Sequence, residues 1–449
     1  MKSTIKKILF PLHEFLKGHK SISYLHKLER SQWRSRDKLY RLQSERLIEF
    51  INHVYMNVPY YKNLFDSLKI KRDDFRNHED LNKLPFLSKD LIRENLEMLK
   101  SDKAVSLMKS NTGGSTGSPL IFYLGKRRIS ADIAAKLRAT RWWGVDIGDP
   151  EIVIWGSPVE LSRQNILRNL RDKLFKTKLL SAFDMSEEKI YKYVSIIRKY
   201  KPKHIFGYPS SIYLLAKFAR QSNMKLNNIG VKVIFCTAER LYDHQRELIL
   251  DVFGAPVANG YGGRDAGFIA HECPHGSMHI TAESIIVEIV DHKGNPLRAG
   301  RSGEIVITHL DSHDFPFIRY KTGDIGALSE DTCSCGRGLP ILKNIEGRTT
   351  DFIITPDGKI MHGLSLVYVL RELEGIKEFK IIQEKPDVFT VNIVKNSVFS
   401  SESEVIIKKG FEKMIGTDVK INFCYPLKIE AEKSGKFRYV VSNIQHPYN

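Results

Sequence analysis

The sequence predicts an α/β protein whose large N-terminal domain has helix-flanked, mostly parallel sheets and a β-rich subdomain, followed by a small α+β C-terminal domain. Three observations support this prediction. The chain has 449 residues, more than one hydrophobic core usually accommodates. Strand-like and helix-like segments alternate through the middle of the chain, as in parallel β-α-β units. Short strands then prevail, and a last unit of about 100 residues is large enough for its own core.

We expect three parts along the chain. Residues 1–100 form the helical part of the large domain, residues 101–346 its core, and residues 347–449 a mobile C-terminal domain. In the first part, apolar residues recur at helical spacing, as in the segment from Leu42 to Val54. Pro59 predicts a helix break, and Ser88 is expected to cap the next helix.

The middle of the chain predicts a parallel sheet covered by helices. Strands are expected at 151–156, 204–208 and 231–236, and helices at 128–143, 186–200, 211–221 and 241–253. In such sheets, ligands bind beyond the carboxyl ends of the strands. The loops that follow these strands are therefore candidate binding loops.

The remaining segments predict short strands and the C-terminal unit. Strands are expected at 280–290, 303–308 and 324–328, with a hairpin turn at 291–296. The last unit is expected to contain a hairpin through 356–358, helices at 364–374 and 402–415, and strands at 377–383, 388–394 and 419–425. This order is typical of a compact α+β domain.

Charge and hydropathy exclude several classes of protein. The net charge is +18, but it is spread along the chain and no basic helix of a DNA-binding type is present. Residues 1–50 are the most basic, with twelve lysines and arginines against five acids. We interpret them as a solvated basic face; weak attraction to an anionic membrane or an anionic substrate is the alternative. No segment predicts a spanning helix or a signal peptide, so we expect a cytoplasmic protein.

A ten-residue segment from Ser110 to Pro119 contains three glycines and five hydroxyl side chains. Such a loop exposes backbone N–H groups beside hydroxyl donors, which suits a phosphate chain. It lacks the lysine of a Walker A loop. From composition alone, a flexible turn between strands is an equally good interpretation.

Four further motifs follow this loop in order: Asn259-Gly260-Tyr261-Gly262-Gly263-Arg264-Asp265, Arg319-Tyr320-Lys321-Thr322-Gly323-Asp324, Glu346-Gly347-Arg348-Thr349-Thr350-Asp351 and Lys433-Ser434-Gly435-Lys436-Phe437-Arg438. The succession resembles the adenylate-forming, acyl-CoA synthetase-like superfamily. Within it, the segment 205–211 and the paired cysteine segments resemble the phenylacetate–CoA ligase and capsular-polysaccharide-biosynthesis branch. The resemblance spans residues 25–440.

The resemblance implies an ATP site. The loop residues Thr112, Gly113, Gly114, Ser115, Thr116 and Gly117 would surround the β- and γ-phosphates. Tyr261, with Gly262 after it, would pack against the adenine, and Ala238 and Glu239 would supply contacts nearby. Asp324 would bind the ribose hydroxyls, and Arg348 would reach the ribose or phosphates. Asp265 stands where the family has a magnesium-binding glutamate and is one methylene shorter, so a water-bridged contact is plausible.

The resemblance also implies a mechanism in two half-reactions. Lys436 would arrive on the small domain and bridge the carboxylate and the α-phosphate, with Lys433 as the alternative. The small domain would then rotate about a hinge near Asp351 for thioester formation.

The cysteines predict a second site. Five cysteines are too few for a disulfide framework. Cys236 and Cys424 lie in apolar runs and are expected to be buried strand residues. Cys273, Cys333 and Cys335 with His279 would supply four zinc ligands, as in relatives of this branch; His275 is the alternative histidine, and free thiols are the alternative to zinc.

The sequence thus predicts an enzyme that uses ATP and Mg²⁺ to activate a carboxylic acid and transfers the acyl group to coenzyme A. One alternative is transfer to an amino sugar, a carrier or a glycan in polysaccharide biosynthesis. A non-catalytic scaffold with this fold is the other. No nucleic-acid partner is expected, and a homodimer and peripheral membrane contact through the basic N-terminus are open. The acid itself cannot be predicted.

Overall fold

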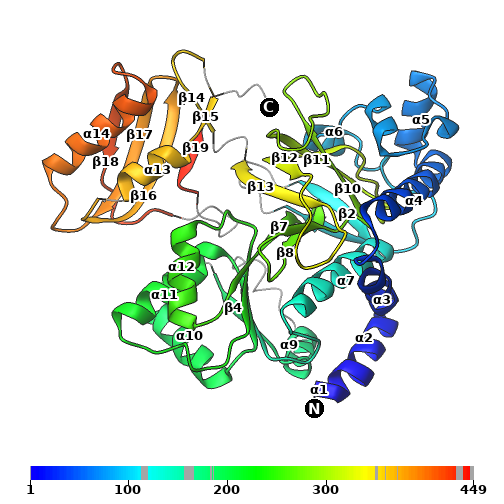
Figure 1. The fold of residues 1–449 in the computed structure, drawn as a ribbon, viewed down its shortest axis with the longest axis horizontal. Coiled ribbons are helices and arrows are strands. Elements are labelled where there is room, and N and C mark those ends of the chain that lie inside the picture. Colours follow the sequence, from blue (N-terminus) through cyan, green and yellow to red (C-terminus); the bar gives the residue numbers. More distant parts are fainter. Residues whose placement is uncertain are drawn as a thin grey trace.

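Figure 1 shows the computed structural model of the chain, in which a large α/β body lies beside a small C-terminal unit. The structure describes residues 2–112, 120–155, 166–182, 185, 187–348, 352–358, 360–371, 373–430 and 438–444. In this part of the chain, no helix combines the length and hydrophobicity needed to cross a membrane.

Helices dominate the first hundred residues, as predicted. They are α1 (Lys2–Thr4), the π-helical turn η1 (Ile5–Leu9), α2 (Phe10–Lys17), α3 (Ser21–Ser31), α4 (Arg36–Asn57), α5 (Pro59–Leu68), the 3₁₀ turns η2 (Arg72–Asp74) and η3 (His78–Lys83), and α6 (Lys89–Glu94). The break at Pro59 is confirmed, because α5 begins there; proline suits the first turn of a helix. Ser88 caps α6, since its hydroxyl accepts a hydrogen bond from the Leu91 N–H at 3.1 Å.

The centre of the large body is one eleven-stranded sheet in the order β10-β11-β12-β13-β9-β8-β7-β6-β5-β3-β4. Its parallel half contains α7 (Lys126–Trp142), β3 (Glu151–Trp155), α9 (Ile166–Leu174), β4 (Thr177–Ser181), α10 (Glu187–Tyr200), β5 (His204–Gly207), α11 (Pro209–Gln221), β6 (Val233–Thr237), α12 (Asp243–Phe253) and β7 (Val257–Gly263). The predicted β-α-β alternation is confirmed, and Cys236 is buried in β6. Strand β4 and helix α9 were not predicted from the sequence.

The antiparallel half continues the same sheet, because β7 pairs with β6 on one side and with β8 on the other. It contains β8 (Gly267–Glu272), β9 (Met278–Ile280), β10 (Ile285–Val290), β11 (Gly303–His309), β12 (Tyr320–Ser329) and β13 (Ile341–Arg348). The single strand predicted at 280–290 is wrong. A turn closed by the Ser284 N–H and the Thr281 carbonyl at 3.0 Å divides it, and the two pieces pair with different strands. A separate hairpin of β1 (Leu107–Asn111) and β2 (Ile121–Gly125) precedes this sheet.

The C-terminal unit has its own hydrophobic core, built only of residues from Ile353 onward. Its elements are β14 (Phe352–Ile354), β15 (Ile360–His362), α13 (Leu364–Arg371), β16 (Ile376–Lys385), β17 (Val388–Lys395), α14 (Ser401–Ile415), β18 (Lys420–Cys424) and β19 (Val440–Ser442). The prediction that Cys424 is buried is wrong. Cys424 is the last residue of β18, an edge strand of the four-stranded sheet. Successive side chains of this strand alternate between the two faces of the sheet, and the Cys424 side chain lies on the exposed face.

Candidate functional site

Aromatic side chains mark the carboxyl ends of the parallel strands. Trp155 ends β3, and Tyr208 follows β5; their rings stack with centroids 4.3 Å apart. Gly207 permits this approach of the two strands, because a Cβ there would lie 2.6 Å from the Ile154 carbonyl oxygen. These side chains therefore form one wall at the edge where open α/β sheets bind ligands.

The loop after β6 holds the next predicted contacts. Ala238 has a φ of +67°, a left-handed conformation that is uncommon for alanine and frequent at functional sites. The Glu239 carboxylate accepts a hydrogen bond from the Ser210 N–H at 3.1 Å, in the first turn of α11. Arg240 donates to the Glu346 carbonyl near the end of β13. This loop thus joins the parallel half of the sheet to the antiparallel half.

Tyr261 and Asp324, which are far apart in the sequence, meet in this structure. The Tyr261 hydroxyl donates to Asp324 Oδ2 at 2.9 Å and lies 3.4 Å from the Thr322 hydroxyl. Burial and the neighbouring Asp324 carboxylate raise the pKa of Tyr261 well above its usual value, so it remains a donor. In the β12–β13 register Asp324 lies opposite Arg348, whose backbone alone the structure describes.

The β1–β2 hairpin brings the base of the glycine-rich loop to the same region. The Thr112 N–H donates to the Leu120 carbonyl, and the Leu120 N–H donates to the Thr112 hydroxyl, both at 3.0 Å. Arg264 reaches the Asn111 carbonyl at 3.5 Å, which links the hairpin to the turn that carries Asp265. Gly113, Gly114, Ser115, Thr116 and Gly117 lie outside the described residues.

Asp265 lies at the tip of the hairpin formed by β7 and β8. Its Oδ2 accepts from the Tyr320 hydroxyl at 2.6 Å, and its Oδ1 accepts from the Ala266 N–H at 3.1 Å. Two glycines fit this tight tip: a Cβ at Gly262 would lie 2.2 Å from the Gly267 carbonyl oxygen, and Gly267 has a φ of +82°. The carboxylate is thereby held in one orientation.

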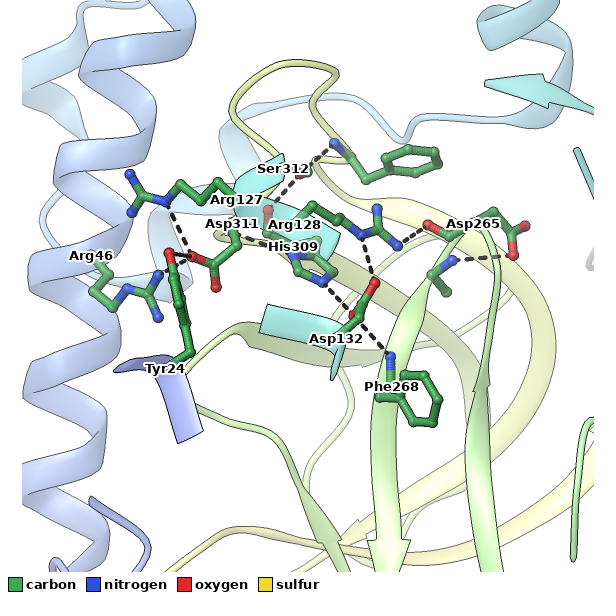
Figure 2. Close-up of polar contacts among 12 residues, drawn as sticks. Tyr24, Arg46, Arg127, Arg128, Asp132, Asp265, Phe268, His309, Asp311 and Ser312 are labelled. Carbon is green, nitrogen blue, oxygen red and sulfur yellow. Dashed lines mark hydrogen bonds and ion pairs between the residues drawn. The ribbon is translucent and has the colours of Figure 1, made fainter. Parts of the chain in front are cut away.

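A buried polar network adjoins the tip and contacts it through Arg128 (Figure 2). Arg128 in α7 donates to the Asp265 carbonyl at 2.6 Å and contacts Asp132 at 3.4 Å. Asp132 also accepts from the Phe268 N–H at 3.3 Å and faces His309 Nε2 at 3.4 Å. His309 Nδ1 accepts from the backbone N–H of Asp311, so the ring proton lies on Nε2 and faces Asp132.

A second cluster lies at the opposite end of β8. Four side chains converge there, with all ligand atoms within 4.8 Å of one another: Cys273, His279, Cys333 and Cys335. Cys273 Sγ is 3.6 Å from Cys333 Sγ, and His279 Nε2 is 3.2 Å from Cys335 Sγ. His275 is not part of this cluster; it is exposed and contacts the Ser334 hydroxyl.

The donor set of this cluster fits a tetrahedral zinc ion, which prefers thiolate and imidazole ligands. The His279 Nδ1 atom faces the Leu339 carbonyl at 3.3 Å, which leaves Nε2 for a metal. Burial lowers the pKa of His279 to about 4, so its imidazole is neutral near pH 7. Burial also raises the pKa of the Cys273 thiol to about 12 when no cation is present.

The predicted residues are thus only partly brought together. Tyr261, Asp324, Asp265 and the base of the Thr112 loop share one region, and Ala238 and Glu239 lie at the next loop of the same sheet edge. Lys436, Lys433 and Asp351 lie outside the described residues. Four residues of the site were assigned no role from the sequence: Tyr320, Thr322, Arg264 and Arg128. The first three stand inside the motifs 259–265 and 319–324, whereas nothing in the sequence around Arg128 signals its contact with Asp265.

The whole chain is similar to several known proteins. Residues 353–443 match the family model of the CapK C-terminal domain. Protein CapK of Staphylococcus aureus is 26% identical, with 96% of this chain and 95% of CapK aligned. The phenylacetate–coenzyme A ligase of Thermus thermophilus is 25% identical over 86% of this chain and 85% of the ligase. A crystal structure of 2-hydroxyisobutyryl-CoA ligase in the postadenylation state superposes with a TM-score of 0.74 at 19% identity, covering 92% of each chain. CapK and phenylacetate–coenzyme A ligases are thus among the homologues of this chain, and its fold matches that of the solved 2-hydroxyisobutyryl-CoA ligase.

Proposed function

We propose that this protein activates a carboxylic acid with ATP as an acyl-adenylate, releases pyrophosphate, and transfers the acyl group to coenzyme A. The observation that carries the proposal is the meeting of Tyr261, Asp324 and the Asp265 turn at the base of the glycine-rich loop. The homology to phenylacetate–coenzyme A ligases, which extends over most of the chain, supports it.

The nucleotide would lie along this sheet edge. Asp324 has two carboxylate oxygens, and such a group suits the vicinal hydroxyls of ribose; the hydroxyl of Tyr261 orients it. The backbone around Ala238 and the ring of Tyr261 would border the adenine. The loop of residues 112–117 would hold the β- and γ-phosphates, because its glycines leave backbone N–H groups accessible.

The magnesium ion that the family implies fits the Asp265 end of the hairpin. This ion is held by few carboxylates together with substrate phosphates, and when bound it offsets the charge of the phosphate chain. Because Tyr320 and Ala266 already donate to Asp265, we propose that its contact to the ion is single or water-bridged. In the chemical step a carboxylate oxygen attacks the α-phosphorus, the bond to the bridging oxygen breaks, and pyrophosphate leaves. Lys436 would stabilise the charge that develops on the α-phosphate.

The small domain would then change its orientation. We propose that it begins near residue 347 and rotates about the region of Asp351, which presents another face for attack by the thiol of coenzyme A. The zinc ion proposed for Cys273, His279, Cys333 and Cys335 has all four positions filled by protein, so its role would be structural.

ATP–pyrophosphate exchange over a panel of acids tests the activity. We expect exchange with at least one acid in the wild type and a loss of roughly 100-fold or more in Lys436→Ala, by analogy with removal of a transition-state charge partner. Lys433→Ala is the matched control and is expected to retain exchange. A loss in Lys433→Ala alone would assign the catalytic role to that lysine, and a wild type that exchanges with no acid would favour a scaffold.

A second acceptor has support from one observation. CapK aligns with nearly the whole chain, and its C-terminal family model matches the small domain. Because this chain resembles CapK as well as the coenzyme A ligases, we keep transfer of the acyl group to an amino sugar, a carrier or a glycan, which the sequence left open, as the alternative to coenzyme A. Mass analysis of the products after adding coenzyme A or an amino-sugar nucleotide to the adenylated enzyme distinguishes the two acceptors.

A further inference from the structure

The first helical segment, formed by α1, η1 and α2, presents four of its apolar residues outward. Phe15 is 78% exposed, Leu16 75%, Ile8 59% and Leu12 51%. Their spacing places them on one side of the helix, where they form a stripe that we call the outer apolar face. A surface helix of a globular protein normally turns such a stripe toward the core, so this arrangement needs a partner.

The opposite side of the segment is attached to the large body by contacts along its length. Lys2 and Lys6 form ion pairs with Asp149 and Asp146. Ile5 is buried against Gly148. Further along, Phe10 and His13 contact the ring of Phe175 at centroid distances of 6.0 and 5.2 Å. The segment is therefore fixed with its ion pairs inward and its apolar residues outward.

The charge around the outer apolar face is positive. Residues 2–20 contain five lysines and one acid, and that acid, Glu14, is buried with 3% exposed. Asp149 and Asp146 offset the charges of Lys2 and Lys6, and the other three lysines, Lys7, Lys17 and Lys20, are exposed. Further lysines lie next to the segment. Lys173 and Lys176, close to Phe175 in the sequence, line an open cavity of about 580 Å³ with Lys178, and Asp172 is the one acid among the described residues of its lining.

We propose that this segment docks on an anionic phospholipid surface, with Ile8, Leu12, Phe15 and Leu16 inserted among the lipids. A helix with apolar residues on one side and lysines beside them lies in the plane of a membrane interface. The charge argues against a second copy as the partner, because two copies of this basic face would repel each other. The surface lies apart from the proposed nucleotide site, so the inference does not depend on the proposed reaction.

Vesicle co-sedimentation of the full chain tests this inference. We expect binding to vesicles of phosphatidylcholine with 30% phosphatidylglycerol, chosen as roughly the anionic content of a charged leaflet, and on the order of tenfold weaker binding to pure phosphatidylcholine. Phe15→Gln/Leu16→Gln should reduce binding to the anionic vesicles about tenfold, because both side chains are exposed and the fold does not need them. Lys7→Glu/Lys17→Glu should remove the preference for anionic vesicles.

The matched control is Val405→Gln/Ile406→Gln, an equal change at residues of α14 that are 51% and 50% exposed. This variant should bind like the wild type. Two results would overturn the proposal. One is binding that the Phe15/Leu16 variant and the control lose equally. The other is a wild type that ignores anionic vesicles but forms a dimer in light scattering, which the Phe15/Leu16 variant abolishes.

Discussion

The two ends of strand β8 hold possible metal ligands in opposite ways. At one end, three cysteines and His279 direct their sulfur and nitrogen atoms at a common point, with Cys273 and Cys333 sulfurs 3.6 Å apart. At the other end, Asp265 already accepts hydrogen bonds from Tyr320 and Ala266. The first arrangement suits a permanent ion, and the second suits an ion that arrives with its substrate. The hydrogen bonds that a potential ligand already makes therefore indicate the kind of metal site better than its residue type does.

The largest expected effect is at the cysteine end. Cys333→Ser/Cys335→Ser should abolish zinc binding and lower the stability of the large body by about 3 kcal/mol or more, because a structural zinc contributes directly to folding. Zinc content by mass spectrometry and the midpoint of thermal unfolding measure this. Cys424→Ser, at an exposed cysteine outside the cluster, should change neither. Wild-type protein that contains no zinc after purification with zinc present would contradict the prediction.

The next effect concerns the support of Asp265. Arg128→Ala removes the donor to the Asp265 carbonyl and leaves the carboxylate of Asp132 without its arginine. We expect a loss of about 3 kcal/mol in the free energy of unfolding, typical of a broken buried pair. Urea unfolding measures it, and Arg220→Ala, which removes an exposed ion pair with Asp251, should cost less than about 1 kcal/mol. Equal losses in the two variants would show that the network does not support the tip.

Acid should weaken the ion pairs of Asp311, the residue whose backbone N–H donates to His309 of this network. Burial alone would raise the pKa of Asp311, but Arg46, His309 and Arg127 outweigh it and hold the pKa at about 2. Because this value lies below that of an unfolded aspartate, the group contributes about 2 kcal/mol above pH 5, and the contribution disappears as the pH falls toward 2. The stability difference between the wild type and Asp311→Asn, measured by urea unfolding, should therefore shrink by about half between pH 7 and pH 3. A constant difference would contradict the prediction; Asp73→Asn, at an exposed aspartate, serves as the control.

The smallest effect is expected from Tyr320→Phe. The change removes one hydrogen bond to Asp265 and keeps the ring in place. A loss of about 1 to 1.5 kcal/mol corresponds to a reduction of roughly fivefold to thirteenfold in exchange rate, and the variant should need more magnesium for half-maximal activity. An unchanged magnesium requirement would mean that Asp265 has no contact with the ion.

The sequence predicted the fold class and most segments of the parallel half, because buried strands and amphipathic helices leave strong periodic patterns there. It did not predict that the β-rich part continues the same sheet. That continuity depends on β7 pairing with β6 and β8, and strand pairing leaves no local pattern. Cys424 was misjudged because an apolar run does not say whether its strand lies at an edge.

The candidate site was predicted through motifs, and the contacts within it were not. Tyr261 and Asp324 were each predicted to contact the nucleotide, but their hydrogen bond joins two residues that are 63 positions apart in the sequence. Arg128 belongs to an ordinary amphipathic helix, and only the folded chain brings it to the Asp265 carbonyl. His279 was preferred to His275 from its resemblance to relatives; the structure places His279 beside the cysteines because β9 pairs with β8, with His279 opposite His271.

The measurement that tests the central claim most directly is the binding of ATP with Mg²⁺ to wild type and to Asp324→Asn by isothermal titration calorimetry. Asparagine keeps the shape of the side chain but loses an acceptor for the ribose hydroxyls, so the dissociation constant should rise about tenfold or more. Asp251→Asn, at an exposed aspartate of α12, should bind like the wild type. Equal affinities in Asp324→Asn and the wild type would contradict a nucleotide site at Tyr261 and Asp324.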